Sequence, residues 1–175
     1  MRHLIPFVAL AAILLAFSAA AGKEVTKMDA MTIESPAFKD NGMIPKQYTC
    51  DGKDINPPIL FRNIPPGTRS LALVVDDPDA PAGTWVHWVL WNIDHGTREV
   101  KEHSVPTGAL EGRNDFRRTS YGGPCPPSGT HRYFFKLYAL DTVLSIGRNS
   151  TKQDLEKAMK GHILAEARTV GLYKR

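Results

Sequence analysis

The sequence contains few cysteines and lacks several patterns that mark common classes of function. Only two of its 175 residues are cysteine and neither belongs to a Cys-x-x-Cys pair, which argues against a metal site built on thiolates. Basic residues are scattered and do not interleave with aromatic ones, so we expect no nucleic-acid partner. The sequence has no internal repeat, low-complexity tract or nucleophile elbow, so neither a repeat protein nor a serine hydrolase is favoured.

Residues 1–21 have the three parts of a secretory signal peptide. Arg2 gives a positive start, residues 4–17 are apolar, and small residues follow up to Ala21. The apolar stretch is short for a membrane-spanning helix, although an uncleaved N-terminal anchor is the alternative. We therefore expect export to the periplasm or outside the cell. Removal of this leader, which includes Arg2, leaves 154 residues and lowers the formal charge from +4 to +3.

The remaining chain is long enough for one well-buried domain. We expect residues 22–30 to be a disordered leader and residues 31–175 to form a single β-sandwich domain. Apolar runs rich in β-branched and aromatic residues, and bounded by proline or glycine, predict its strands. The strongest runs cover residues 70–75, 85–93 and 132–140, and weaker candidates cover 32–35, 59–61 and 169–173.

One helix is predicted near the C-terminus. Residues 150–153 resemble a capping box, and Leu155, Met159 and Ile163 follow at helical spacing. This apolar stripe should pack against a sheet. The fold class we expect is therefore mainly β, an antiparallel β-sandwich with one or two C-terminal or peripheral helices.

The two cysteines that follow the leader are Cys50 and Cys125. An exported protein meets oxidising conditions, so a single disulfide is the favoured interpretation and two free thiols are the alternative. The disulfide would join the loop before the first core strand to a proline-rich loop before His131.

Two separated segments place titratable side chains at the ends of predicted strands. The first contains Asp77 and Asp79 and leads to His87, and the second contains the proline-rich loop and His131. Because side chains alternate across a strand, each candidate should end an apolar face, where such groups have perturbed acidity. The expected faces are Asp77 with Leu71, Leu73 and Val75; His87 with Val89, Trp91 and Ile93; and His131 with Tyr133, Phe135 and Leu137.

Each of these residues can also be explained by a structural role, without any function in binding or catalysis. A histidine beside tryptophans is often a core residue, and an Asp-Pro-Asp sequence can be turn chemistry. Burial of Asp77, Asp79, His87 and His131 near one another would, however, be costly without a function. Their chemistry suits a small anion pocket, a divalent metal site or an acid–base pair.

At these residues the sequence resembles the phosphatidylethanolamine-binding protein family, also called the Raf kinase inhibitor-like proteins. The resemblance spans most of residues 31–173 and is nearest to the bacterial and archaeal branch. It depends on two motifs that are far apart but in the right order. The matching elements are Tyr48-Thr-Cys-Asp-Gly52, Asn56-Pro-Pro58, Asp77-Pro-Asp-Ala-Pro81, Trp85-Val-His-Trp88, Gly122-Gly-Pro124 and Gly129-Thr-His-Arg-Tyr133.

The resemblance implies an antiparallel β-sandwich with a small anion pocket at one end. The proline-rich loop reads Gly-Pro-Cys-Pro-Pro here and departs from the animal members. The implied ligand-binding residues are Asp77, His87, His131 and Tyr133 in the lining, Asp79 in the shaping of the loop, and Gly123 and Pro126 in the wall.

The expected function is that of an exported, non-catalytic anion-binding protein. It would recognise a phosphate-like headgroup or a phosphorylated partner and act as a regulator, in the manner of a kinase or protease inhibitor. We expect no cofactor and at most peripheral membrane contact, and the sequence leaves the oligomeric state open. The alternatives are a divalent-metal site made by Asp77, Asp79, His87 and His131, and a hydrolase that depends on His/Asp acid–base chemistry.

Overall fold

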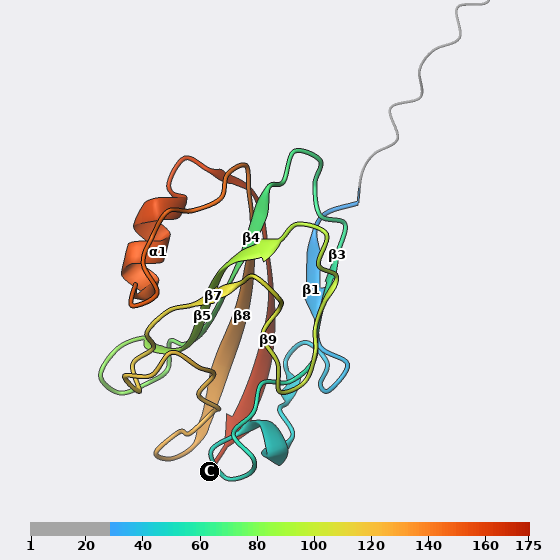
Figure 1. Ribbon diagram of the computed structural model, residues 1–175. Helices are drawn as coiled ribbons and strands as arrows, with labels where there is room; N and C mark the ends of the chain where they lie inside the picture. Colours follow the sequence, from blue (N-terminus) through green and yellow to red (C-terminus); the bar gives the residue numbers. More distant parts are fainter. Residues whose placement is uncertain (1–28) are drawn as a thin grey trace, which may run out of the picture.

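The computed structural model describes residues 29–175, in which two β-sheets form the frame of the molecule (Figure 1). The predicted signal peptide and most of the predicted disordered leader lie outside the described residues. The smaller sheet has three strands in the order β1-β3-β6. These are β1 (Thr32–Glu34), β3 (Ile59–Arg62) and β6 (Glu99–Val100).

The larger sheet has six strands in the order β2-β9-β8-β4-β5-β7. Its long central strands are the apolar runs that the sequence predicts, extended by up to two residues at their ends. A short 3-10 helix, η1 (Lys46–Tyr48), follows the first edge strand. The strands are β2 (Gly42–Met43), β4 (Ser70–Asp77), β5 (Trp85–Asp94), β7 (Leu110–Glu111), β8 (Thr130–Leu140) and β9 (Ile163–Lys174).

The larger sheet is mixed, so the expectation of a strictly antiparallel sandwich is wrong at one edge. Strand β2 pairs with β9 in parallel, whereas the other strand pairs of the described residues are antiparallel. Only antiparallel neighbours can be joined by a tight hairpin, and β2 reaches β9 from a distant part of the chain. Its direction is therefore not set by a turn, and the mainly β class is unchanged.

The main core lies between the two sheets. Alternate residues of β4 and β8 point toward the smaller sheet, as the sequence predicts for the faces that end in Asp77 and His131. Burial of such side chains is the main stabilising contribution of a sandwich. The largest fully buried members of this core are Ile44, Ile59, Phe61, Leu71, Leu73, Trp88, Leu90, Ile93, Tyr133, Phe135 and Leu137.

The other face of the larger sheet is partly covered by α1 (Lys152–Met159), which lies on the opposite side from β1 and β3 (Figure 1). Thr151 and Asp154 form its capping box, one residue later than the sequence suggests. Leu155 and Met159 are buried against the sheet as predicted. Among the described residues, no helix has the length and apolar character needed to span a membrane.

The predicted continuation of this helix through Ile163 is wrong. The chain turns at Gly161, whose φ of +85° suits glycine, and Ile163 begins β9. Pairing with β8 along nearly the whole length of β9 supplies the backbone hydrogen bonds that a longer helix would otherwise have made. The last strand is consequently much longer than residues 169–173.

Candidate functional site

A cavity of about 240 Å³ lies at the end of the larger sheet where β4 and β5 are joined by a loop and β8 begins. It is lined by three separate stretches of the chain, residues 77–87, Phe116 and residues 125–131. A hollow of about 780 Å³ lies elsewhere, between β1 and β9, but the smaller cavity is the one where two histidines and a buried aspartate converge. Its lining consists of Asp77, Ala80, Pro81, Trp85, His87, Phe116, Cys125, Pro126, Pro127 and His131.

Asp77 and His131 form a buried pair on neighbouring strands. The Nδ1 atom of His131 lies 2.7 Å from Oδ2 of Asp77, and the backbone N–H of Asp79 donates to Oδ1 of Asp77 at 2.8 Å. Both carboxylate oxygens therefore accept hydrogen bonds, which suits an ionised group. Asp77 orients the imidazole so that the other ring nitrogen, Nε2, is left for the cavity.

His87 reaches the same cavity because β5 contains a bulge. Val75 pairs with Trp88 and Asp76 pairs with Val86, so His87 is the extra residue in the ladder. A bulge turns a side chain that strict alternation would place on the opposite face. The prediction that His87 shares a face with Val89 and Trp91 is therefore wrong, because those residues pack on the helix side, whereas His87 stacks edge-on against Tyr133. Ile93, the third residue of the predicted face, does lie in the same core as Tyr133.

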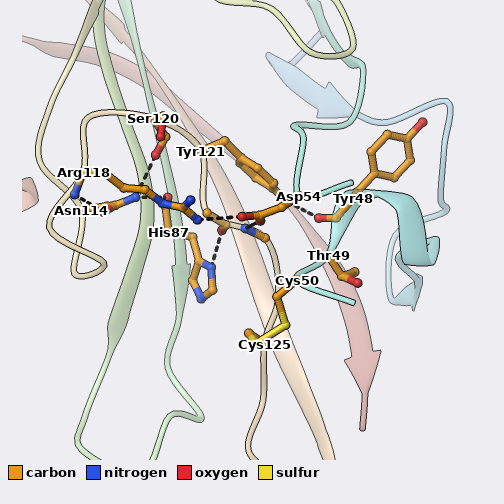
Figure 2. Close-up of polar contacts among 12 residues, drawn as sticks. Tyr48, Thr49, Cys50, Asp54, His87, Asn114, Arg118, Ser120, Tyr121 and Cys125 are labelled. Carbon is orange, nitrogen blue, oxygen red and sulfur yellow. Dashed lines mark hydrogen bonds and ion pairs between the residues drawn. A yellow bond between two sulfur atoms is a disulfide. The ribbon is translucent and has the colours of Figure 1, made fainter. Parts of the chain in front are cut away.

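The tautomer of His87 follows from its partner. Its Nδ1 atom lies 2.6 Å from the backbone oxygen of Gly122, and a carbonyl can only accept, so Nδ1 carries the proton (Figure 2). Burial lowers the pKa of His87, against the raising effects of the Gly122 carbonyl and the charge of Asp77. The uncharged ring therefore has its proton on Nδ1 and its lone pair on Nε2.

Asp79 lies outside the cavity lining and holds the loop after β4. Arg132 donates to its carboxylate from the backbone N–H, from Nε and from Nη2, at 2.9, 2.9 and 2.6 Å. These hydrogen bonds lower the pKa of Asp79 to about 2. The loop-shaping role that the resemblance implies for Asp79 fits this geometry.

Tyr133 and Gly123 are also absent from the lining. Tyr133 is fully buried behind His87, and burial raises the pKa of its phenol. Its hydroxyl has no hydrogen-bond partner among the described residues. Gly123 is packed against Tyr48 and Thr49, where its backbone N–H donates to Asp54 at 2.6 Å. Of the seven predicted ligand residues, the cavity therefore brings together Asp77, His87, Pro126 and His131.

The proline-rich loop that forms one wall is fastened to the rest of the molecule (Figure 2). Cys50 and Cys125 form a disulfide, and the backbone N–H of Cys50 donates a hydrogen bond to the backbone oxygen of Pro124. Asp54 bridges the backbone N–H of Gly123 and the guanidinium of Arg118, which donates to it at 2.8 Å. These contacts fix the position of Pro126 and Pro127 against the two histidines.

Sequence reasoning missed part of the apolar wall. Phe116 contacts both Trp85 and His87 edge-on, with ring centroids 5.4 and 5.2 Å apart, and no sequence motif singled it out. Asn114 anchors that segment by donating to the backbone oxygens of His87 and Ser120 (Figure 2). The only sequence signal for this segment is an asparagine in a turn-rich stretch, and an asparagine does not show which distant residues it will bind.

The divalent-metal alternative does not fit the geometry. The carboxylate of Asp79 accepts hydrogen bonds from Arg132, and the carboxylate of Asp77 accepts them from His131 and the backbone N–H of Asp79. Within residues 29–175, no group of three or more histidine, cysteine or acidic side chains is arranged to hold a metal ion. The four residues proposed as a metal set therefore do not form one.

Comparisons with known proteins agree on one family. The family model described as phosphatidylethanolamine-binding protein matches residues 34–174. A UPF0098 protein of Methanothermobacter thermautotrophicus is 48% identical over 150 residues, covering 83% of this chain and 99% of its own length. A UPF0098 protein of Aquifex aeolicus is 50% identical over 152 residues, covering 83% of this chain and 89% of its own length.

Two solved structures are similar throughout. A phosphatidylethanolamine-binding protein homolog from Chlamydia trachomatis has 40% sequence identity and a TM-score of 0.81, and the match covers 83% of this chain and 98% of that one. YbcL of E. coli, described as a member of the mammalian family, has 29% identity and a TM-score of 0.79, and the match covers 84% of this chain and 99% of that one.

Proposed function

Because this chain belongs to the phosphatidylethanolamine-binding protein family, we propose that its cavity binds a small anion, either a phosphate-like headgroup or the phosphoryl group of a partner. The Asp77–His131 pair is the observation that carries this proposal. Asp77 fixes the ring through Nδ1 and is the counter-ion of the charged imidazole, whose Nε2–H would then donate to a ligand in the cavity. A charge-assisted hydrogen bond of this kind is short and strong.

Asp77 does not repel the anion, because its carboxylate is already paired with other groups of the protein. Both of its oxygens accept hydrogen bonds from protein groups, and the side chain is almost entirely buried. When His131 is protonated, the pair is neutral overall while its outward-facing atom is a donor. Asp77 thus acts through the imidazole.

The cavity supports binding better than catalysis. Its lining contains no serine or threonine, and its single cysteine is in the disulfide. A hydrolase that used an Asp–His pair would need a nucleophile, or a group that positions water, beside the ring. We therefore propose a non-catalytic role as a regulator that resembles a kinase or protease inhibitor.

We also propose that the protein is exported. The leader pattern at residues 1–21 motivates this, and the Cys50–Cys125 disulfide supports it, since such bonds persist in oxidising compartments. Periplasmic or secreted protein would then sample anions or phosphorylated partners there, with at most peripheral contact to a membrane.

Calorimetric titration with inorganic phosphate tests the proposal. The variant His131→Ala should lose at least about tenfold in affinity. His162→Ala is the matched control, since His162 also pairs with an aspartate, Asp141, but is exposed and absent from the cavity lining.

The control should bind phosphate like the unaltered protein. Phosphate affinity that survives in His131→Ala would contradict the proposal.

A further inference from the structure

We infer that the cavity selects a phosphoryl group that carries its own proton, a phosphomonoester monoanion, in preference to phosphodiesters and sulfate esters of the same charge. The inference rests on the proposed function and specifies the chemistry of its ligand. It depends on the two imidazoles having different roles at one site.

His87 is fixed as a hydrogen-bond acceptor. Its Nδ1–H is donated to the Gly122 carbonyl at 2.6 Å, and the Gly122 N–H in turn donates to the backbone oxygen of His87 at 3.0 Å. Asn114 donates to the same backbone oxygen at 3.0 Å. Phe116 and Tyr133 pack edge-on against the ring from two sides. The ring therefore cannot rotate to present its N–H without breaking a buried hydrogen bond.

The lone pair of His87 is accessible from the cavity. Nε2 of His87 has no hydrogen-bond partner among residues 29–175, and it is not fully buried. The same holds for Nε2 of His131. Both residues line the cavity, so both atoms are available to whatever occupies it.

His131 has the opposite role. Its Nδ1 faces the Asp77 carboxylate, so a charged imidazole at this position is paired with that carboxylate and presents Nε2–H to the cavity. The other titratable groups close to the two rings act in different directions: Asp76 and Asp77 favour a charged imidazole, Tyr133 is neutral, and the charge of Asp79 is matched by Arg132. At His87 burial is the largest influence and lowers the pKa, which favours the neutral ring. The cavity thus presents one donor and one acceptor.

This pair of groups matches a particular anion. A phosphomonoester monoanion has one P–OH group, which can donate to His87, and unprotonated oxygens, which can accept from His131. A phosphodiester or a sulfate ester has the same charge but no O–H group. It would leave the His87 lone pair against an anionic oxygen, or require a proton on a ring whose burial opposes it.

The shape of the cavity limits the rest of the ligand. Its volume is about 240 Å³, and Trp85, Phe116 and Pro126 supply apolar walls. The phosphoryl group would therefore carry a small or narrow substituent at this point, whether it belongs to a free metabolite or to a phosphorylated side chain.

Three small ligands test the selectivity at equal charge: methyl phosphate, dimethyl phosphate and methyl sulfate, each titrated by calorimetry at about pH 5.5. Below the second phosphate pKa near about 6, methyl phosphate is a monoanion with one P–OH group. We expect it to bind at least about tenfold more tightly than the other two.

Equal binding of all three ligands would overturn the inference and leave the proposed function standing. Failure of all three to bind would overturn the proposed function itself, and the inference with it.

Variants at His87 assign the selectivity to this residue. His87→Gln can donate to Gly122 through its amide N–H and still present an acceptor oxygen, so it should keep the preference for methyl phosphate. His87→Phe removes the acceptor, so this variant should bind methyl phosphate no more tightly than dimethyl phosphate or methyl sulfate. An unchanged ratio in His87→Phe would contradict the role of His87, and if that variant does not fold, the three-ligand comparison on the unaltered protein still decides.

A comparison of the affinities of a capped phosphoserine peptide and of methyl phosphate shows whether the phosphoryl group belongs to a protein or to a free metabolite. Tighter binding of the peptide indicates a modified protein, and tighter binding of methyl phosphate indicates a free phosphomonoester. The inference requires at least one of them to bind more tightly than methyl sulfate.

Discussion

At the scale of single residues, the site depends on side chains whose charges are already matched within the protein. Asp77 is matched by His131, and Asp79 is matched by Arg132. The guanidinium of Arg132 forms two of its hydrogen bonds with one carboxylate, a geometry that arginine favours. Because Arg132 directly follows His131, this ion pair also fixes the start of β8, where the histidine lies.

The Asp79–Arg132 pair should make stability depend on pH in the acid range. The pKa of Asp79 is lowered to about 2, whereas an unfolded aspartate titrates near about 3.9. The pair is therefore fully stabilising above about pH 4, and its contribution is lost as the pH falls toward about 2. Asp79→Asn should lower the melting temperature near neutral pH, and the difference from the unaltered protein should disappear near about pH 2.

Thermal unfolding followed by circular dichroism at several pH values measures this effect. Because the side chain of Arg132 is 54% exposed, the change should be modest. The exposed Asp29 provides the control variant Asp29→Asn, which should melt like the unaltered protein at every pH. A difference at Asp79 that stays constant from neutral to acid pH would show that the ion pair is not its cause.

At the scale of elements, the proline-rich loop is placed by close backbone packing. A Cβ atom at Gly123 would lie 2.6 Å from the carbonyl oxygen of Tyr48 and 2.8 Å from Cα of Thr49, which no side-chain rotation can relieve. Gly123→Ala should therefore reduce the free energy of unfolding by about 1–3 kcal/mol, as overpacking commonly does. Urea denaturation measures the change.

Gly147→Ala is the matched control, because a Cβ atom there would meet nothing within 4 Å. It should change the free energy of unfolding by no more than about 0.5 kcal/mol. Should Gly123→Ala prove as stable as this control, the loop is not held by close contact with residues 48 and 49.

The sequence determined much of the fold because hydrophobic pattern and alternation are local. The central strands follow from local apolar runs, and the faces that end in Asp77 and His131 follow from period-two alternation. His87 was assigned to the wrong face because a bulge depends on how two strands pair, which no single strand records. Phe116 was missed for the same reason, since its contacts with Trp85 and His87 are made across long sequence separations.

At the scale of the whole molecule, the cavity exists only where distant segments are held together. The disulfide joins Cys50 and Cys125 across a sequence separation of 75 residues, and Asp54 adds bonds to Gly123 and Arg118. The two sheets give the rigid frame, and irregular segments carry most of the lining, as is common for binding sites. The parallel edge strand and the helix lie outside the cavity lining and do not alter its chemistry.

The most direct test of the central claim is nitrogen-15 NMR of the histidine rings during titration with methyl phosphate, since each ring nitrogen reports its own protonation. The account predicts that, in the complex, Nε2 of His131 carries a proton while His87 keeps its proton on Nδ1 alone. If neither ring responds at ligand concentrations that saturate the protein, the anion does not bind in this cavity and the account is contradicted.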